Sequence, residues 1–304
     1  MLMLWIILCL IAAALWSLGA FFDNYQTDVI FRNKLPQAMK RINGPFYLII
    51  AVIIAIVCRI QLPALDQIGF LLLSGIVNSV ATLFYYAALK NEEATGATIF
   101  YQLQPIMFLI LEFVLFGESI SPMQIIGLVL ILAAPLIVVF SRKRASARRT
   151  EMRAAILLII YVLMATVSGE IAIRMGRGLD FIPVFVFYLI GRGASDTIIS
   201  FLPSLRRRHK YVMAHNKKIY LSCTLINQCI CTIAEFMYRY GLIIGVAALG
   251  SAITNATELI LTFIFGIILS IIWPKFGREK LRHREVIAHI LAVILCAIGI
   301  FVIQ

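Results

Sequence analysis

Long apolar stretches separated by short polar gaps dominate this chain. A helix that crosses a bilayer needs about 20 mostly apolar residues, and the runs do not alternate with the period of two that a barrel strand requires. In lipid, only helices and closed barrels satisfy their own backbone groups. The pattern therefore predicts an all-α membrane protein with ten transmembrane helices, at residues 2–22, 44–60, 68–89, 94–116, 122–140, 154–173, 181–203, 219–239, 246–272 and 284–303.

The composition agrees with a membrane protein. The chain of 304 residues is 62% hydrophobic and only 14% charged, whereas a soluble domain has about a quarter charged residues. No Lys or Arg precedes the first apolar stretch, although a signal peptide begins with positive charge. We therefore expect the first stretch to remain in the protein as a helix.

The positive charge is sorted along the chain. The net charge is +12, and most of the 27 Lys and Arg residues lie after the first, third, fifth, seventh and ninth stretches, Lys40 among them. Cytoplasmic loops are enriched in Lys and Arg. This predicts that the odd-numbered gaps are cytoplasmic and that both termini are not. Contact with anionic headgroups explains the basic runs better than nucleic-acid binding does.

The chain also shows signs of an internal repeat. Residues 84–86 (FYY) resemble residues 236–238 (FMY), and in both places a span that opens with small residues follows, then a turn with Gly and Glu near 117–118 and 277–279. Chance similarity between apolar helices is the alternative. We expect two five-helix units, residues 1–141 and 153–304, joined by a basic cytoplasmic linker at 142–152. Because five is odd, the units would be inverted, which is typical of secondary transporters.

Several short motifs resemble the repeat signature of the drug/metabolite transporter superfamily, in its EamA-type ten-helix branch. They are Tyr85 to Leu89, Ala94 to Thr98, Gln104 to Ile106, Leu115 to Glu118 and Gln124 to Gly127, with Trp16 and Ser17 in the first stretch. The second half departs from the signature, since Thr257 and Glu258 stand where a proline is expected. The resemblance implies a metabolite transporter in a bacterial inner membrane, often an exporter, without a cofactor. The chain also lacks a G-x-x-x-x-G-K-[ST] phosphate loop.

Ionisable residues inside apolar stretches are costly in lipid and are candidates for function. Arg192 and Asp196 are four residues apart on one predicted helix, so they share a face and could form a structural ion pair. Alternatively, Arg192 could hold a substrate carboxylate or phosphate. Glu258 is isolated in its stretch, where loss of water favours the protonated carboxyl. Asp196 and Glu258 are therefore the candidate coupling groups, with simple packing roles as the alternative. Glu235 and Arg239 are interpreted as a pair at the membrane interface.

Uncharged polar and aromatic side chains are the other candidates for a binding site. Tyr101 and Gln104 share one face of their helix, and Pro105 removes the usual partner of the Tyr101 carbonyl, which predicts a kink. A kink that serves packing alone is the alternative. Together with Arg192, the predicted substrate-binding residues are Trp16, Asn78, Tyr85, Tyr101, Gln104, Tyr188 and Asn227.

These features favour a secondary transporter that moves a small polar metabolite, amino-acid-like and exported, by alternating access. A flippase for a lipid-linked substrate is the alternative. An enzyme is disfavoured because the chain has no metal-ligand spacing and no nucleophile elbow, so no catalytic or metal residues are expected. The expected partners are the metabolite and the anionic bilayer, without nucleic acid, and the protein is expected as a monomer or homodimer.

Overall fold

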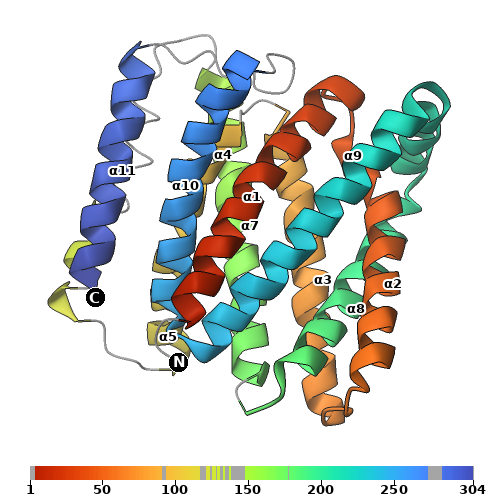
Figure 1. Ribbon diagram of the computed structural model, residues 1–304, viewed down its shortest axis with the longest axis horizontal. Helices are drawn as coiled ribbons and strands as arrows, with labels where there is room; N and C mark the ends of the chain where they lie inside the picture. Colours follow the sequence, from red (N-terminus) through yellow and green to blue (C-terminus); the bar gives the residue numbers. More distant parts are fainter. Residues whose placement is uncertain are drawn as a thin grey trace.

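The computed structural model describes residues 4–90, 94–116, 121–123, 125–127, 129–130, 133, 137, 148–176, 178–272 and 283–303, and these residues form helices without strands. Figure 1 shows the bundle. Its elements are α1 (Leu4–Tyr25), a π-helical turn η1 (Gln26–Ile30), a 3-10 turn η2 (Pro36–Met39), α2 (Lys40–Cys58), α3 (Leu65–Ala88), α4 (Ala94–Tyr101), α5 (Gln104–Phe116), α7 (Arg148–Gly176), α8 (Phe181–Ser200), α9 (Pro203–Ile244), α10 (Ala247–Ile272) and α11 (His283–Ile303).

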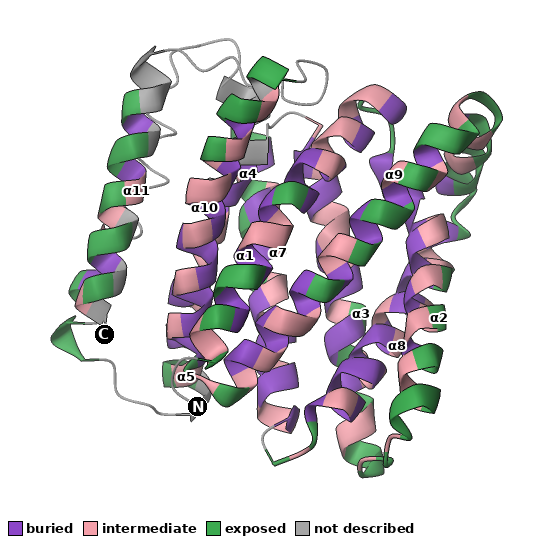
Figure 2. Cartoon of the chain, in the orientation of Figure 1, coloured by how far each residue is buried: buried purple, intermediate pink, exposed green. Residues whose placement is uncertain are grey.

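The lengths and surfaces of these helices fit a bilayer. Seven helices among the described residues are long and apolar enough to cross a membrane. Large aliphatic side chains such as Ile56, Val57 and Ile271 are exposed, and Figure 2 shows how exposed residues follow the outer faces of the helices. An apolar surface of this extent is unstable in water and is expected where lipid covers it.

Helices from the two halves of the chain pack against each other. α3 packs along α7 and α8, α2 packs along α8, and α1 packs along α9 and α10. α10 also contacts α4, α5 and α11, and α11 lies at one edge of the bundle in Figure 1. The polar centre described below is surrounded by helices from both ends of the sequence.

Glycines allow α8 to approach its neighbours very closely. A Cβ atom added at Gly75 of α3 would lie 2.1 Å from the Tyr188 carbonyl oxygen of α8, and one at Gly191 would lie 2.1 Å from the Leu72 carbonyl oxygen of α3. Gly44 of α2 meets Thr197 of α8 in the same way, at 2.4 Å from its Oγ1. Small residues at helix contacts are a common way to pack membrane helices. Here they fix the position of α8 between α2 and α3.

The structure corrects two predicted gaps. The basic residues from Arg206 to Lys218, expected in a polar gap, belong to α9, which runs from Pro203 to Ile244 with a bend at Asn216 (φ −137°, ψ 30°). Lys and Arg are good helix formers, so a helix can continue through basic residues beyond its apolar part. The apolar stretch in the sequence therefore locates the part of the helix in the membrane but not the end of the helix. Lys40, also expected in a gap, is fully buried in the first turn of α2.

Some predicted features fall outside the described residues. The stretch at 122–140 lies largely there, as do the Gly–Glu turns at 117–118 and 277–279. α7 begins at Arg148, inside the segment expected as a linker.

Candidate functional site

A cavity of about 120 Å³ lies where α1, α2, α3, α4, α5, α7, α8, α9 and α10 meet. A water molecule takes about 30 Å³ in the liquid, so the space holds several waters or a small solute. The predicted residues that line it are Trp16, Asn78, Tyr85, Tyr101, Gln104, Arg192 and Glu258. Tyr188 and Asn227 bind residues of the lining through hydrogen bonds. The structure thus gathers most of the predicted site residues around one space.

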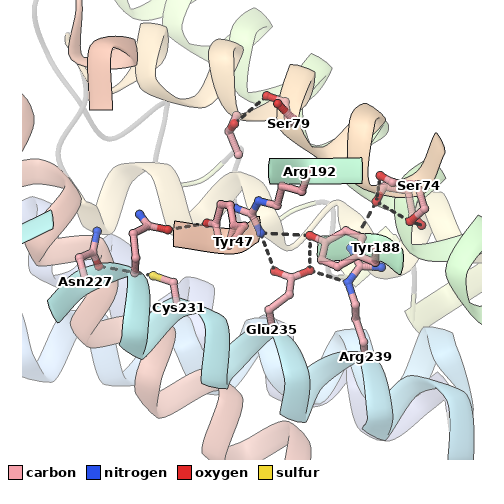
Figure 3. A network of polar contacts seen from close by, with 12 residues as sticks. Tyr47, Ser74, Ser79, Tyr188, Arg192, Asn227, Cys231, Glu235 and Arg239 are labelled. Atoms are coloured by element: carbon pink, nitrogen blue, oxygen red, sulfur yellow. Dashed lines mark hydrogen bonds and ion pairs between the residues drawn. The ribbon is translucent and has the colours of Figure 1, made fainter. Parts of the chain in front are cut away.

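Two arginines and a glutamate form a charged cluster on the cavity wall, shown in Figure 3. Arg239 Nε donates to Glu235 Oε1 at 2.6 Å, and Arg192 Nη1 lies 3.6 Å from Glu235 Oε2. Tyr188 donates its hydroxyl to Glu235 at 2.9 Å and accepts from Arg192 at 3.0 Å. With two guanidinium groups to one carboxylate, the cluster has a formal charge of +1. Glu235 and Arg239 are buried here rather than forming the interface pair expected from the sequence.

Aromatic rings support both guanidinium groups of this cluster. The Arg192 guanidinium lies 4.6 Å from the centre of the Tyr47 ring, and that of Arg239 lies 3.7 Å from the centre of the Tyr188 ring. Two of their N–H groups, Arg192 Nε and Arg239 Nη1, have no hydrogen-bond partner within the described part of the chain. Unpaired buried donors of a positive cluster are suited to an anionic group, because a planar guanidinium binds a carboxylate through two N–H groups.

Asp196 pairs with Lys40 and not with Arg192, so of the two possibilities for Arg192 the structural pair with Asp196 is not formed. Lys40 Nζ also donates to the Ser79 carbonyl oxygen at 2.7 Å and to Thr82 Oγ1 at 2.8 Å, while Ser79 donates its hydroxyl to Asp196. Lys40 satisfies Asp196 from α2, and Arg192 turns toward Glu235.

Asp23 of α1 lines the cavity and was missed by the sequence analysis. Its carboxylate accepts hydrogen bonds from Asn227 Nδ2 at 2.7 Å and from the hydroxyls of Tyr85 at 3.2 Å and Tyr86 at 3.3 Å. The predicted first span ended at residue 22, whereas α1 continues to Tyr25. The spacing Trp16, Gly19/Ala20, Asp23 places these residues on one helix face and was the signal available in the sequence.

Glu258 of α10 is a buried cavity residue whose carboxyl group has no partner among the described residues. Its exposed fraction is 3%, and no described residue forms a hydrogen bond or an ion pair with its side chain. The side chains of Tyr101 and Tyr161 lie within electrostatic range of it. Its backbone carbonyl oxygen accepts a hydrogen bond from Ser17 Oγ at 3.2 Å. A buried ionised group without a partner is costly, so this carboxyl is suited to accept a proton or a ligand.

The helix before Pro105 is interrupted, as the proline predicts. α4 ends at Tyr101 and α5 begins at Gln104. The Tyr101 carbonyl oxygen is not left free for a ligand, because Asn255 Nδ2 of α10 donates to it at 2.7 Å. Gln102 Nε2 in turn donates to the Asn255 carbonyl oxygen at 2.6 Å. This reciprocal pair ties the interruption to α10 beside Glu258.

Comparisons with known proteins identify a related family and a related fold. Residues 3–140 match the model of the EamA-like transporter family. One crystal structure of a protein is similar in fold, with a TM-score of 0.68 at 16% sequence identity. The alignment covers 98% of this chain and 94% of the chain in that structure. At this identity the likeness shows the fold alone. No curated protein matches the chain.

Proposed function

We propose that this protein, whose residues 3–140 match the model of the EamA-like transporter family, belongs to the drug/metabolite transporter superfamily and is a secondary transporter that moves a small polar metabolite by alternating access. It is an integral, multi-pass membrane protein. The observation that carries the proposal is the buried, charged cavity between helices of both halves. Charged groups inside a membrane protein are typical of substrate and ion pathways.

The Arg192–Glu235–Arg239 cluster supports a cargo with an anionic group. Its N–H donors that have no partner among the described residues, together with its net positive charge, suit a carboxylate, and the small cavity suits a small molecule. The proposed cargo is therefore amino-acid-like. The direction proposed is efflux, because members of the superfamily are often exporters. A flippase for a lipid-linked substrate is less well supported, because these charged residues line the space in which an acyl chain would have to fit.

The packing of the helices supports the proposal of two inverted five-helix units, residues 1–141 and 153–304. In that arrangement α1 corresponds to α7, α2 to α8 and α3 to α9. If the two units are equivalent, the contact of α3 with α7 should have a counterpart between α9 and α1, and the contact of α2 with α8 should be its own counterpart. All of these contacts occur. A central site between such units can be opened to either side of the membrane by rocking one bundle against the other.

We assign proton coupling to Glu258 and not to Asp196. Asp196 has its own cation in Lys40, whereas the Glu258 carboxyl has no partner among the described residues. The other charged or titratable groups that line the same cavity are Asp23, Tyr47, Tyr85, Tyr86, Tyr101, Tyr161, Arg192, Cys231, Glu235, Tyr238 and Arg239. A carboxyl that exchanges its proton as the cavity opens to each side would couple the cargo to the proton gradient.

The test is transport in reconstituted vesicles. Vesicles that contain the protein receive an imposed pH gradient and a mixture of radiolabelled common amino acids. We expect the gradient to drive transport by the wild type. Glu258→Gln should remove the response to the gradient, while Asp66→Asn, a substitution of an exposed residue at the start of α3, should keep it.

Gradient-dependent transport by Glu258→Gln would remove this residue from the coupling mechanism. Absence of any transport by the wild type across the amino-acid mixture and a mixture of organic amines and organic acids would contradict the proposed function itself.

Orientation and location complete the proposal. The sorting of positive charge supports cytoplasmic odd-numbered gaps and termini on the other side of a bacterial inner membrane. The exposed basic residues at the start of α9, such as Arg206 and Lys210, would then face anionic headgroups on the cytoplasmic side.

A further inference from the structure

The buried carboxyl groups of the described residues fall into two classes. Three are held by cations: Glu170 by Arg174 at 2.7 Å, Glu235 by Arg239 at 2.6 Å, and Asp196 by Lys40. Asp23 and Glu258, with exposed fractions of 8% and 3%, form no ion pair with any described residue. Both of these line the central cavity. The two acids without a cation are therefore in the place where a ligand can reach them.

Three tyrosine rings gather at the same part of the cavity, from α3, α4 and α7. The ring centres of Tyr85 and Tyr161 are 5.2 Å apart, those of Tyr101 and Tyr161 are 5.6 Å apart, and those of Tyr85 and Tyr101 are 6.4 Å apart. The Tyr85 hydroxyl donates to Asp23, and Tyr101 lies within electrostatic range of both Asp23 and Glu258. The aromatic cluster and the two acids thus surround one region.

This region adjoins the positive cluster, since Tyr161 lies within electrostatic range of Glu235 and Arg192 as well as of Glu258, and its Asp23 side lies further along α9. Asn227, which binds Asp23, and Glu235, which binds the arginines, are eight residues apart in one helix, which corresponds to about 12 Å at 1.5 Å per residue. Figure 3 shows Asn227 on one side of Tyr47 and Arg239 on the other. The cavity therefore has a positive end near Glu235 and Arg239 and an acidic, aromatic end near Asp23.

We propose that the acidic end, formed by Asp23, Glu258, Tyr85, Tyr101 and Tyr161, binds the ammonium group of the cargo. Two carboxyl groups without a cation attract a positive charge strongly in a medium of low dielectric constant, and the faces of tyrosine rings attract cations, including quaternary ammonium groups that cannot donate hydrogen bonds. The cargo class is then an organic ammonium compound, including zwitterions whose anionic group reaches the arginines. This inference rests on the proposed function and narrows its cargo.

The test measures binding and needs no transport. Purified wild type is titrated calorimetrically in detergent with choline and with 3,3-dimethylbutan-1-ol, which has the same shape but a carbon atom in place of the charged nitrogen. We expect choline to bind at least about tenfold more tightly, the factor that a desolvated cation–π site and a nearby carboxylate supply. Asp23→Asn should reduce this preference to less than about threefold, whereas Asp66→Asn, at an exposed aspartate of α3, should preserve it.

The aromatic contribution is tested at Tyr161. Tyr161→Phe keeps the ring face and should keep the choline preference, while Tyr161→Leu removes the face and should reduce it about fivefold. Glu258→Gln is a second neutralising variant, and it removes no side-chain hydrogen bond between described residues. If Asp23→Asn fails to fold after weakening its bond to Asn227, Glu258→Gln decides the test, with the same expected loss of preference.

The two proposals fail in different ways. Equal binding of choline and its carbon isostere by the wild type, no binding of choline, or an undiminished preference in the neutralised variants would overturn the ammonium site. Amino-acid transport in vesicles could still be observed in that case. Conversely, selective choline binding together with absent transport would leave the ammonium site standing and remove the transporter proposal.

Discussion

A methyl group at Gly75 should force α3 and α8 apart beside the cavity. A Cβ atom at this position would stand 2.1 Å from the Tyr188 carbonyl oxygen and 2.5 Å from the Arg192 backbone nitrogen. Ordinary carbon–oxygen contacts are about 3.3–3.6 Å, so the helices would have to separate by about 1 Å. The opposing atoms are backbone and cannot turn aside as a side chain would.

The expected cost follows from this geometry. Overpacking in a well-packed core costs about 1–3 kcal/mol, and a clash with helix backbone belongs at the upper end, so we expect Gly75→Ala to lower the free energy of unfolding by about 3 kcal/mol. The matched control is Gly69→Ala on the same helix, where a Cβ would meet no atom within 4 Å. That substitution should raise stability by up to about 1 kcal/mol through helix propensity.

The assay is unfolding of both purified variants in mixed detergent micelles, followed by circular dichroism. Because Arg192 lies directly at the contact, Gly75→Ala should also weaken cargo binding at the arginine cluster. Equal stability of Gly75→Ala and Gly69→Ala would refute the argument, since it would mean that α3 and α8 do not approach as closely as the glycines indicate.

Two further predictions concern buried polar contacts. Lys40→Met leaves Asp196 buried without its cation and should cost about 3–5 kcal/mol, whereas Lys40→Met/Asp196→Leu should recover most of that loss; if the double variant were as unstable as the single one, the ion pair would not be the cause. Asn255→Ala removes the donor to the Tyr101 carbonyl and should cost about 1–3 kcal/mol. Hydrogen exchange should then accelerate in α4 and α5, and unchanged exchange there would contradict this role.

The apolar runs predict most of the helices because a membrane span must be both long and apolar. Local chemistry also locates the interruption before Pro105 and places Trp16, Tyr101 and Gln104 on the faces that meet the cavity. Each of these inferences uses residues close together in the sequence. The physical signal is the period of the helix or the missing N–H group of a proline, and neither depends on distant parts of the chain.

The same reasoning does not place Lys40, and for Asp23 it gives the helix face but not the partners. From the sequence, a charged residue near the end of an apolar run is assigned to a loop. Lys40 is instead buried, because α2, α3 and α8 pack together and bring Asp196 to it. Likewise, Asp23 becomes part of the site because Asn227 and two tyrosines from other helices donate to it. The partner of a charge is a tertiary property, so sequence spacing alone suggested the wrong partner for Arg192.

The packing of α1 along α9 and α10 also limits how the chain can be divided. Cys9, Ala12 and Ala13 of α1 are fully buried, and Gly241 of α9 is so close that an added Cβ would lie 3.1 Å from the Cys9 sulfur. A fragment that stopped near residue 140 would lack α9 and α10 and would expose this face of α1 to lipid. The family model matches residues 3–140, but burial of the inner face of α1 depends on helices that lie beyond that segment.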